Sequence, residues 1–124
     1  VGAAATAAGP GGWLYRFDVP TNVDGANLGA THASEIAFTF NTFADPKAAG
    51  VVMHDREDPA LQKLAQQWST TVMNFARTGD PNGGGLPAWV PYENSSRQSL
   101  VLDVESWCAD AELDIEHRKL WGEA

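Results

Sequence analysis

Several features that often identify a class of protein are scarce in this sequence. Its 124 residues include one cysteine, Cys108, which excludes an internal disulfide and a zinc site built from cysteines. Basic residues are also few, because eight Lys and Arg stand against sixteen Asp and Glu, a net charge of −8. Nucleic acids and anionic membranes attract basic patches, so the charge argues against both as partners.

Long hydrophobic runs are missing as well. No stretch approaches the roughly 20 consecutive apolar residues of a membrane span, and no signal-peptide pattern opens the chain. We therefore expect a soluble protein, with cytoplasmic and secreted locations both open. The opening residues Val1–Ala4 do not resemble an initiation site, so we expect one domain at most that is a piece of something longer.

Large aliphatic side chains are sparse. Leu, Ile, Val and Phe together make up about a fifth of the chain, close to the composition of disordered segments. Five tryptophans act in the opposite direction, because each one buries a large apolar area. We expect a chain that folds around a thin core and gains stability from a partner surface.

Local patterns divide the first half of the chain. Residues 1–11 are expected to be the remnant of a preceding helix or disordered, since an alanine run is followed by Gly9 and Pro10. Alternating aromatic residues predict a strand over 12–19, and turn-forming residues predict a loop over 21–31. Residues 36–38 fit either one helical turn or a strand.

The clearest element is a helix over 59–78. Asp58 suits the N-cap, Pro59 the first turn and Gly79 the left-handed position after the last turn. Further along, the patterns predict a loop, a strand and an amphipathic C-terminal helix, at residues 79–98, 100–104 and 113–121. Strands separated by helices indicate an α/β fold, but two strands are too few for a stable sheet of that class. Other strands must therefore come from elsewhere.

Three histidines are candidates for chemistry. His32 follows a glycine-containing loop after a strand, where a general base is often displayed, although a surface histidine at a helix start fits the same pattern. His54 lies in a charged run and is expected to be solvated. His117 lies on the apolar side of the last predicted helix and is expected to be partly buried.

Other site signatures are weak. His32 and Glu35 are three residues apart, but two ligands do not make a metal site, so no metal is expected. The run Gly83–Gly85 follows a helix rather than joining a strand to a helix, which indicates a flexible loop and not a phosphate or oxyanion site. No serine lies in a G-x-S-x-G motif, and a histidine base without an activated nucleophile cannot carry out acyl transfer.

Residues 29–40 read Gly-Ala-Thr-His-Ala-Ser-Glu-Ile-Ala-Phe-Thr-Phe. This block resembles the histidine loop of the type-B carboxylesterase/cholinesterase family, G-A-x-H-x-x-E-L-x-F-x-F, with Ile36–Ala37 where the family usually has Leu-Pro. Further blocks agree with the family in order and spacing, at residues 14–18, 68, 74–82, 86–92 and 100–103. The resemblance extends from Gly12 to Trp121.

The resemblance implies that residues 12–124 are the C-terminal part of an α/β-hydrolase domain. In that fold the triad order is Ser, then Asp or Glu, then His, so this segment would carry only the histidine. It implies that His32 is the catalytic base and that Glu35 supports the loop by hydrogen bonding, with an ordinary glutamate of a first helical turn as the alternative. The substrate would be a small carboxylic ester, and no cofactor would be needed.

Two other readings stay open. Some members of the superfamily are binding or adhesion proteins that keep the fold without the nucleophile, and a free-standing acidic interaction module is a third possibility. The expected partner of the chain is the missing N-terminal part of the same protein, or a second copy that associates through exposed strand edges.

Overall fold

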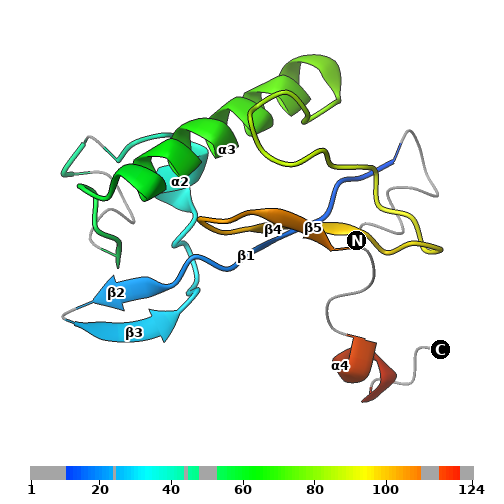
Figure 1. Ribbon diagram of the computed structural model, residues 1–124, viewed down its shortest axis with the longest axis horizontal. Helices are drawn as coiled ribbons and strands as arrows, with labels where there is room; N and C mark the ends of the chain where they lie inside the picture. Colours follow the sequence, from blue (N-terminus) through cyan, green and yellow to red (C-terminus); the bar gives the residue numbers. More distant parts are fainter. Residues whose placement is uncertain (1–10, 24, 44, 48–52, 110–114, 121–124) are drawn as a thin grey trace.

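The computed structural model describes residues 11–23, 25–43, 45–47, 53–109 and 115–120 (Figure 1). Its elements follow in the order β1 (Tyr15–Phe17), β2 (Thr21–Val23), β3 (Ala26–Gly29), α2 (Ile36–Thr39), α3 (Pro59–Thr78), β4 (Ser99–Leu102), β5 (Trp107–Ala109) and α4 (Ile115–Leu120). The predicted remnant at 1–11 falls almost entirely outside the described residues, as do Leu113 and Trp121 of the predicted last helix.

A three-stranded sheet with the order β1-β4-β5 forms the base of the described structure. β1 and β4 are parallel, with Tyr15 opposite Leu100, whereas β4 and β5 are antiparallel, with Leu100 opposite Cys108. All four residues of β4 are buried, because this strand has a neighbour on each side and α3 lies along one face of the sheet (Figure 1). The predicted strands at 12–19 and 100–104 are confirmed in shorter form, and β5 was not predicted.

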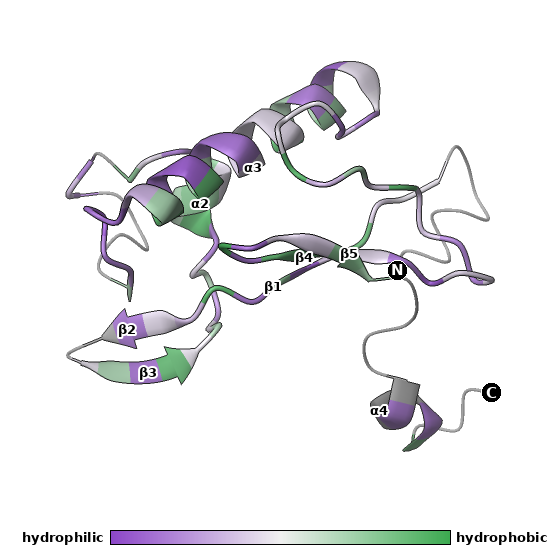
Figure 2. Cartoon of the chain, viewed as in Figure 1, coloured by the Kyte–Doolittle hydropathy of each residue, from purple (hydrophilic) through white to green (hydrophobic). Residues whose placement is uncertain are grey.

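Helix α3 confirms the prediction over 59–78. The Asp58 side chain accepts a hydrogen bond from the Ala60 backbone N–H at 2.8 Å, and Gly79 has the left-handed φ of 77° at the C-terminal end. Hydrophilic and hydrophobic residues alternate along the helix (Figure 2). Its buried side chains form the stripe expected of an amphipathic helix: Leu61, Leu64, Ala65, Trp68 and Thr71.

The predicted loop at 21–31 is wrong for most of its length, because β2 and β3 form an antiparallel hairpin there. The described side chains of this hairpin after Thr21 are largely exposed, with Leu28 at 59%. A hairpin that buries neither face needs no alternation of apolar and polar residues, so its sequence has no strand signal. The Thr21 hydroxyl donates to the Gly29 carbonyl at 2.9 Å and closes the base of the hairpin.

Helix α2 packs against α3 and resolves the ambiguity at residues 36–38 in favour of a helical turn. The Trp68 indole Nε1 donates to the Thr39 hydroxyl at 3.0 Å and joins the two helices. The core contains side chains from the sheet, from both helices and from the loops: Val19, Ala37, Phe38, Phe43, Leu61, Leu64, Ala65, Trp68, Trp89, Leu100 and Leu102. Among the described helices, none is long and apolar enough to cross a membrane.

Candidate functional site

His32 lies in a turn between β3 and α2, and its side chain is exposed. The Thr31 carbonyl, just before it, accepts two hydrogen bonds from Ser34, one from the hydroxyl at 2.7 Å and one from the backbone N–H at 3.2 Å. These bonds close a turn around His32 and Ala33. Ala33 has a φ of 66°, a left-handed conformation that a residue with a side chain seldom adopts. The turn therefore displays His32 on a tightly bent backbone.

Glu35 follows this turn as the N-cap residue of α2 and is half-buried. Its backbone carbonyl accepts hydrogen bonds from the N–H groups of Phe38 and Thr39, whereas its side chain makes no capping bond to α2. The pKa of Tyr15 is raised, first by burial and second by the negative charge of Glu35. The carboxylate therefore influences the beginning of β1, and its predicted hydrogen bonding to the histidine loop stays a prediction.

His54 lies in the interior, which is the opposite of the prediction. Its side chain is 7% exposed and is enclosed by three phenylalanine rings. Phe38 lies edge-on with its ring centre 5.0 Å away, Phe17 lies edge-on at 6.4 Å, and Phe43 is stacked at 6.3 Å. We call these four residues the histidine cage.

The buried His54 ring contacts the turn that carries His32. Its Nε2 lies 3.1 Å from the backbone oxygen of Ser34. A carbonyl oxygen only accepts hydrogen bonds, so Nε2 carries the hydrogen in the neutral ring. Burial lowers the pKa of His54, while the nearby carbonyls of Ser34 and Pro20 act in the opposite direction. The ring is therefore neutral near pH 7 and donates to Ser34.

The error at His54 has a clear cause. The sequence Met53-His54-Asp55-Arg56-Glu57-Asp58 is polar after the histidine, and these neighbours are exposed or half-exposed as expected. The apolar surroundings of the ring come from residues 11 to 37 positions earlier in the chain. No pattern near position 54 carries that information. The prediction for His117 concerns a side chain outside the described part of the structure.

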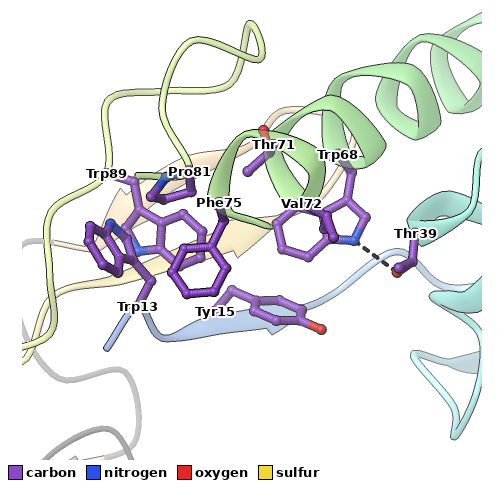
Figure 3. Close-up of a pocket in the computed structure, with 9 residues that line it drawn as sticks. All are labelled: Trp13, Tyr15, Thr39, Trp68, Thr71, Val72, Phe75, Pro81 and Trp89. Atoms are coloured by element: carbon purple, nitrogen blue, oxygen red, sulfur yellow. Dashed lines mark hydrogen bonds between the residues drawn. The ribbon is translucent and has the colours of Figure 1, made fainter. Parts of the chain in front are cut away.

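An aromatic groove of about 280 Å³ opens between α3 and β1 (Figure 3). It is lined by Trp13, Tyr15, Thr39, Trp68, Thr71, Val72, Phe75, Pro81 and Trp89. Trp13 and Trp89 lie together at one end, with Trp68 and Thr39 at the other. Neither His32 nor Glu35 lines this groove, but two of its lining residues lie near Glu35: Tyr15, whose pKa the Glu35 charge raises, and Thr39, whose N–H donates to the Glu35 carbonyl.

The remaining candidates carry no chemistry in the described residues. The loop at Gly83–Gly85 is held against α3, where Gln67 Nε2 donates to the Gly85 carbonyl at 2.8 Å. A Cβ atom on Gly84 would clash with the Thr71 hydroxyl and lie 2.9 Å from the Gln67 carbonyl, so glycine permits this close approach. Within the described ranges, no three His, Cys, Asp or Glu side chains gather as a metal site would require.

Comparison with known proteins gives a consistent result. The model of the carboxylesterase family matches residues 3–121. Carboxylesterase 5A of Canis lupus familiaris is 35% identical over 97 residues, which cover 74% of this chain and 16% of the relative. Acylcarnitine hydrolase of Rattus norvegicus is 31% identical over 115 residues, which cover 88% of this chain and 19% of the relative.

Solved structures show the same relationship. A carboxylesterase of Geobacillus stearothermophilus superimposes with a TM-score of 0.70 and 34% sequence identity, covering 88% of this chain and 21% of that structure. The expected α/β-hydrolase fold class, with few strands and packing helices, is confirmed by this similarity. The chain spans about a fifth or less of the length of the relatives it matches. It belongs to the carboxylesterase family.

Proposed function

We propose that His32 is the general acid–base of a serine carboxylesterase active site. The observation that carries this proposal is the placement of His32 itself. The residue that the family resemblance identifies as the triad histidine is exposed on a turn closed by two hydrogen bonds. A general base must reach the proton that it removes, so an accessible imidazole on a defined backbone suits the role.

In this proposal the His32 imidazole takes the proton from a serine hydroxyl as the serine attacks the ester carbonyl. The same nitrogen then returns the proton to the leaving alcohol. Family order places the nucleophile and the acidic member of the triad in sequence before this segment. Glu35, three residues after His32 and next to the turn, supports the loop in which the imidazole is presented.

The substrate class is a small carboxylic ester. Membership of the carboxylesterase family supports this part of the proposal, as does a relative named acylcarnitine hydrolase. The reaction needs no cofactor, since the nucleophile, the base and the carbonyl-activating groups are all supplied by protein.

The direct test is substitution of His32 in the complete gene product. His32→Ala should lower kcat for p-nitrophenyl acetate by about 10²–10⁴-fold, because the proton transfer loses its carrier. Lys63→Ala, on the exposed side of α3, is the matched surface control and should leave kcat unchanged. Equal activity of the His32→Ala variant and the wild type would refute the proposal.

The 124-residue chain by itself is expected to be inactive. It should hydrolyse p-nitrophenyl acetate no faster than free imidazole at the same concentration, because it holds a base without an activated serine. Saturable turnover that disappears in His32→Ala would show that the chain contains its own nucleophile.

A non-catalytic adhesion protein of the same superfamily would have a similar histidine turn. The coding sequence directly before this segment separates the two functions. A nucleophile motif such as Gly-Glu-Ser-Ala-Gly in that sequence supports the esterase. A sequence in which the serine of this motif is absent refutes the esterase function.

A further inference from the structure

We infer that His54 is a positioning residue for His32, acting through its hydrogen bond to the backbone of Ser34. This inference rests on the proposed function of His32 and adds a second histidine to it. His54 does not touch the reacting atoms in this arrangement. It contacts the turn from the interior of the protein, whereas the His32 side chain is exposed.

The turn needs an external anchor. Its own closure depends on the Thr31 carbonyl, which accepts both hydrogen bonds from Ser34. Between these two residues, Ala33 has a left-handed backbone, which costs energy for a residue with a Cβ atom. A strained turn on the surface persists only where the surrounding structure restrains it.

Ser34 is the point at which that restraint is applied. Its side chain is fully buried, and it uses three polar groups at once. The hydroxyl and the N–H bind Thr31 on one side of His32, and the carbonyl accepts from His54 Nε2 on the other side. A shift of Ser34 therefore moves the turn that carries His32.

His54 is itself held in one orientation. Phe17 comes from β1, Phe38 from α2 and Phe43 from the loop after α2, so three separate segments fix the plane of the ring. The edge-on contact with Phe38 and the stacked contact with Phe43 leave little room for rotation. The position of Nε2 is thus determined by the core, and the hydrogen bond transmits this position to the turn.

Packing alone does not account for a histidine at this position. The second ring nitrogen, Nδ1, is buried and has no hydrogen-bond partner within the described residues. A phenylalanine would fill the cage without this cost, since a buried polar atom without a partner is destabilising. The Nε2–H bond to Ser34 offsets this cost, and the nearby Pro20 carbonyl is a second backbone group that acts on the ring.

The test uses a matched pair of variants in the complete gene product, His54→Gln and His54→Met. The two side chains have similar length and flexibility, but only Gln has an N–H donor that can reach the Ser34 carbonyl. Both lose the aromatic ring, so the damage that they share reports on packing. The ratio of the two kcat values reports on the hydrogen bond to Ser34.

We expect kcat of His54→Met to be roughly 10-fold lower than that of His54→Gln, because a displaced catalytic group loses alignment. The KM values of the two variants should agree within about twofold, since substrate binding does not involve the turn backbone. Phe43→Leu loosens the cage without removing the donor. It should lower thermal stability and lower kcat by less than His54→Met does, because the ring is less restrained but the N–H donor remains.

A second measurement works on the 124-residue chain and does not depend on activity. Amide hydrogen exchange at Ser34 should be at least about 10-fold faster in His54→Met than in His54→Gln, with exchange inside α3 equal in the two. Equal kcat in the two variants would overturn the inference, and equal exchange at Ser34 would show that the hydrogen bond does not restrain the turn.

Failure of the inference and failure of the proposed function give different results. If His32→Ala is inactive while the Met and Gln variants have equal kcat, His32 is catalytic and His54 does not position it. If His32→Ala keeps full activity, the proposed function is refuted and the positioning role is refuted with it.

Discussion

Helix α3 begins and ends at residues next to it in the sequence, whereas the turn at His32 is anchored by a side chain 20 positions after Ser34. Asp58 caps the first turn of the helix, and Gly79 ends the last one. The histidine turn has local hydrogen bonds too, but its buried anchor lies in a cage assembled from three other segments. Local signals therefore suffice for a scaffold helix, and the geometry of the candidate catalytic residue depends on tertiary packing.

Removal of a phenylalanine ring from the histidine cage should produce the largest difference between the histidine turn and α3. Phe38 is fully buried, and its ring contacts Phe17, Phe43 and His54. Phe38→Ala is expected to lower the free energy of unfolding by about 3–5 kcal/mol, the usual effect of deleting a buried aromatic ring. Urea denaturation measures the loss, and hydrogen exchange should show larger changes at the turn than within α3. A loss below about 1 kcal/mol would contradict this account of the core.

Acidification should act on the turn through His54. The folded-state pKa of this ring lies below its ordinary value of 6.5, so the unfolded chain binds the proton first as the pH falls. Its contribution to stability is fully present above about pH 6.5 and is lost as the pH decreases below that value, at a rate of up to about 1.4 kcal/mol per pH unit.

Measurement of unfolding free energies from pH 7.5 to 5 for the wild type and His54→Phe isolates this effect. The two proteins differ only at position 54, so the difference between the two curves reports this histidine. Parallel curves would show that protonation of His54 is not linked to folding.

Loss of the helix cap should affect the other region alone. Asp58→Ala removes the acceptor of the Ala60 N–H bond and should lower the free energy of unfolding by about 1 kcal/mol. Asp58→Asn keeps the acceptor and serves as the matched variant, with most of the stability retained. Faster amide hydrogen exchange at Ser34 in Asp58→Ala would show that the histidine turn depends on the helix cap, contrary to this expectation.

The smallest expected effect concerns the edges of the three-stranded sheet. β1 and β5 are the outer strands of the three-stranded sheet, and the Trp107 side chain on β5 is 48% exposed. We expect the chain to self-associate weakly through these strands, and Trp107→Lys should reduce the association because a charge on an edge strand opposes pairing. Sedimentation velocity over a range of concentrations is the measurement, and a wild-type protein that stays monomeric throughout would contradict the expectation.

Much of the fold could be predicted where neighbours in the sequence carry the information. The ends of α3 follow from Asp58, Pro59 and Gly79, and the apolar character of residues 100–102 identified β4. The β2–β3 hairpin was missed because its surface strands have no apolar face, and β5 was missed because three residues are too few for a pattern.

The candidate site divides in the same way. His32 and Glu35 were identified from a motif of twelve residues, which runs from the end of β3 through the turn at His32 and along α2. The role of His54 could not be predicted, because burial depends on which distant side chains surround a residue. Phe17, Phe38 and Phe43 are spread over 26 positions and become neighbours of His54 only when the sheet, α2 and the following loop pack together. The sequence by itself determined that His32 is the exposed histidine of the motif, because that depends on local backbone geometry. Only the tertiary structure decided that His54 contacts the turn at Ser34, because that depends on contacts made across the core.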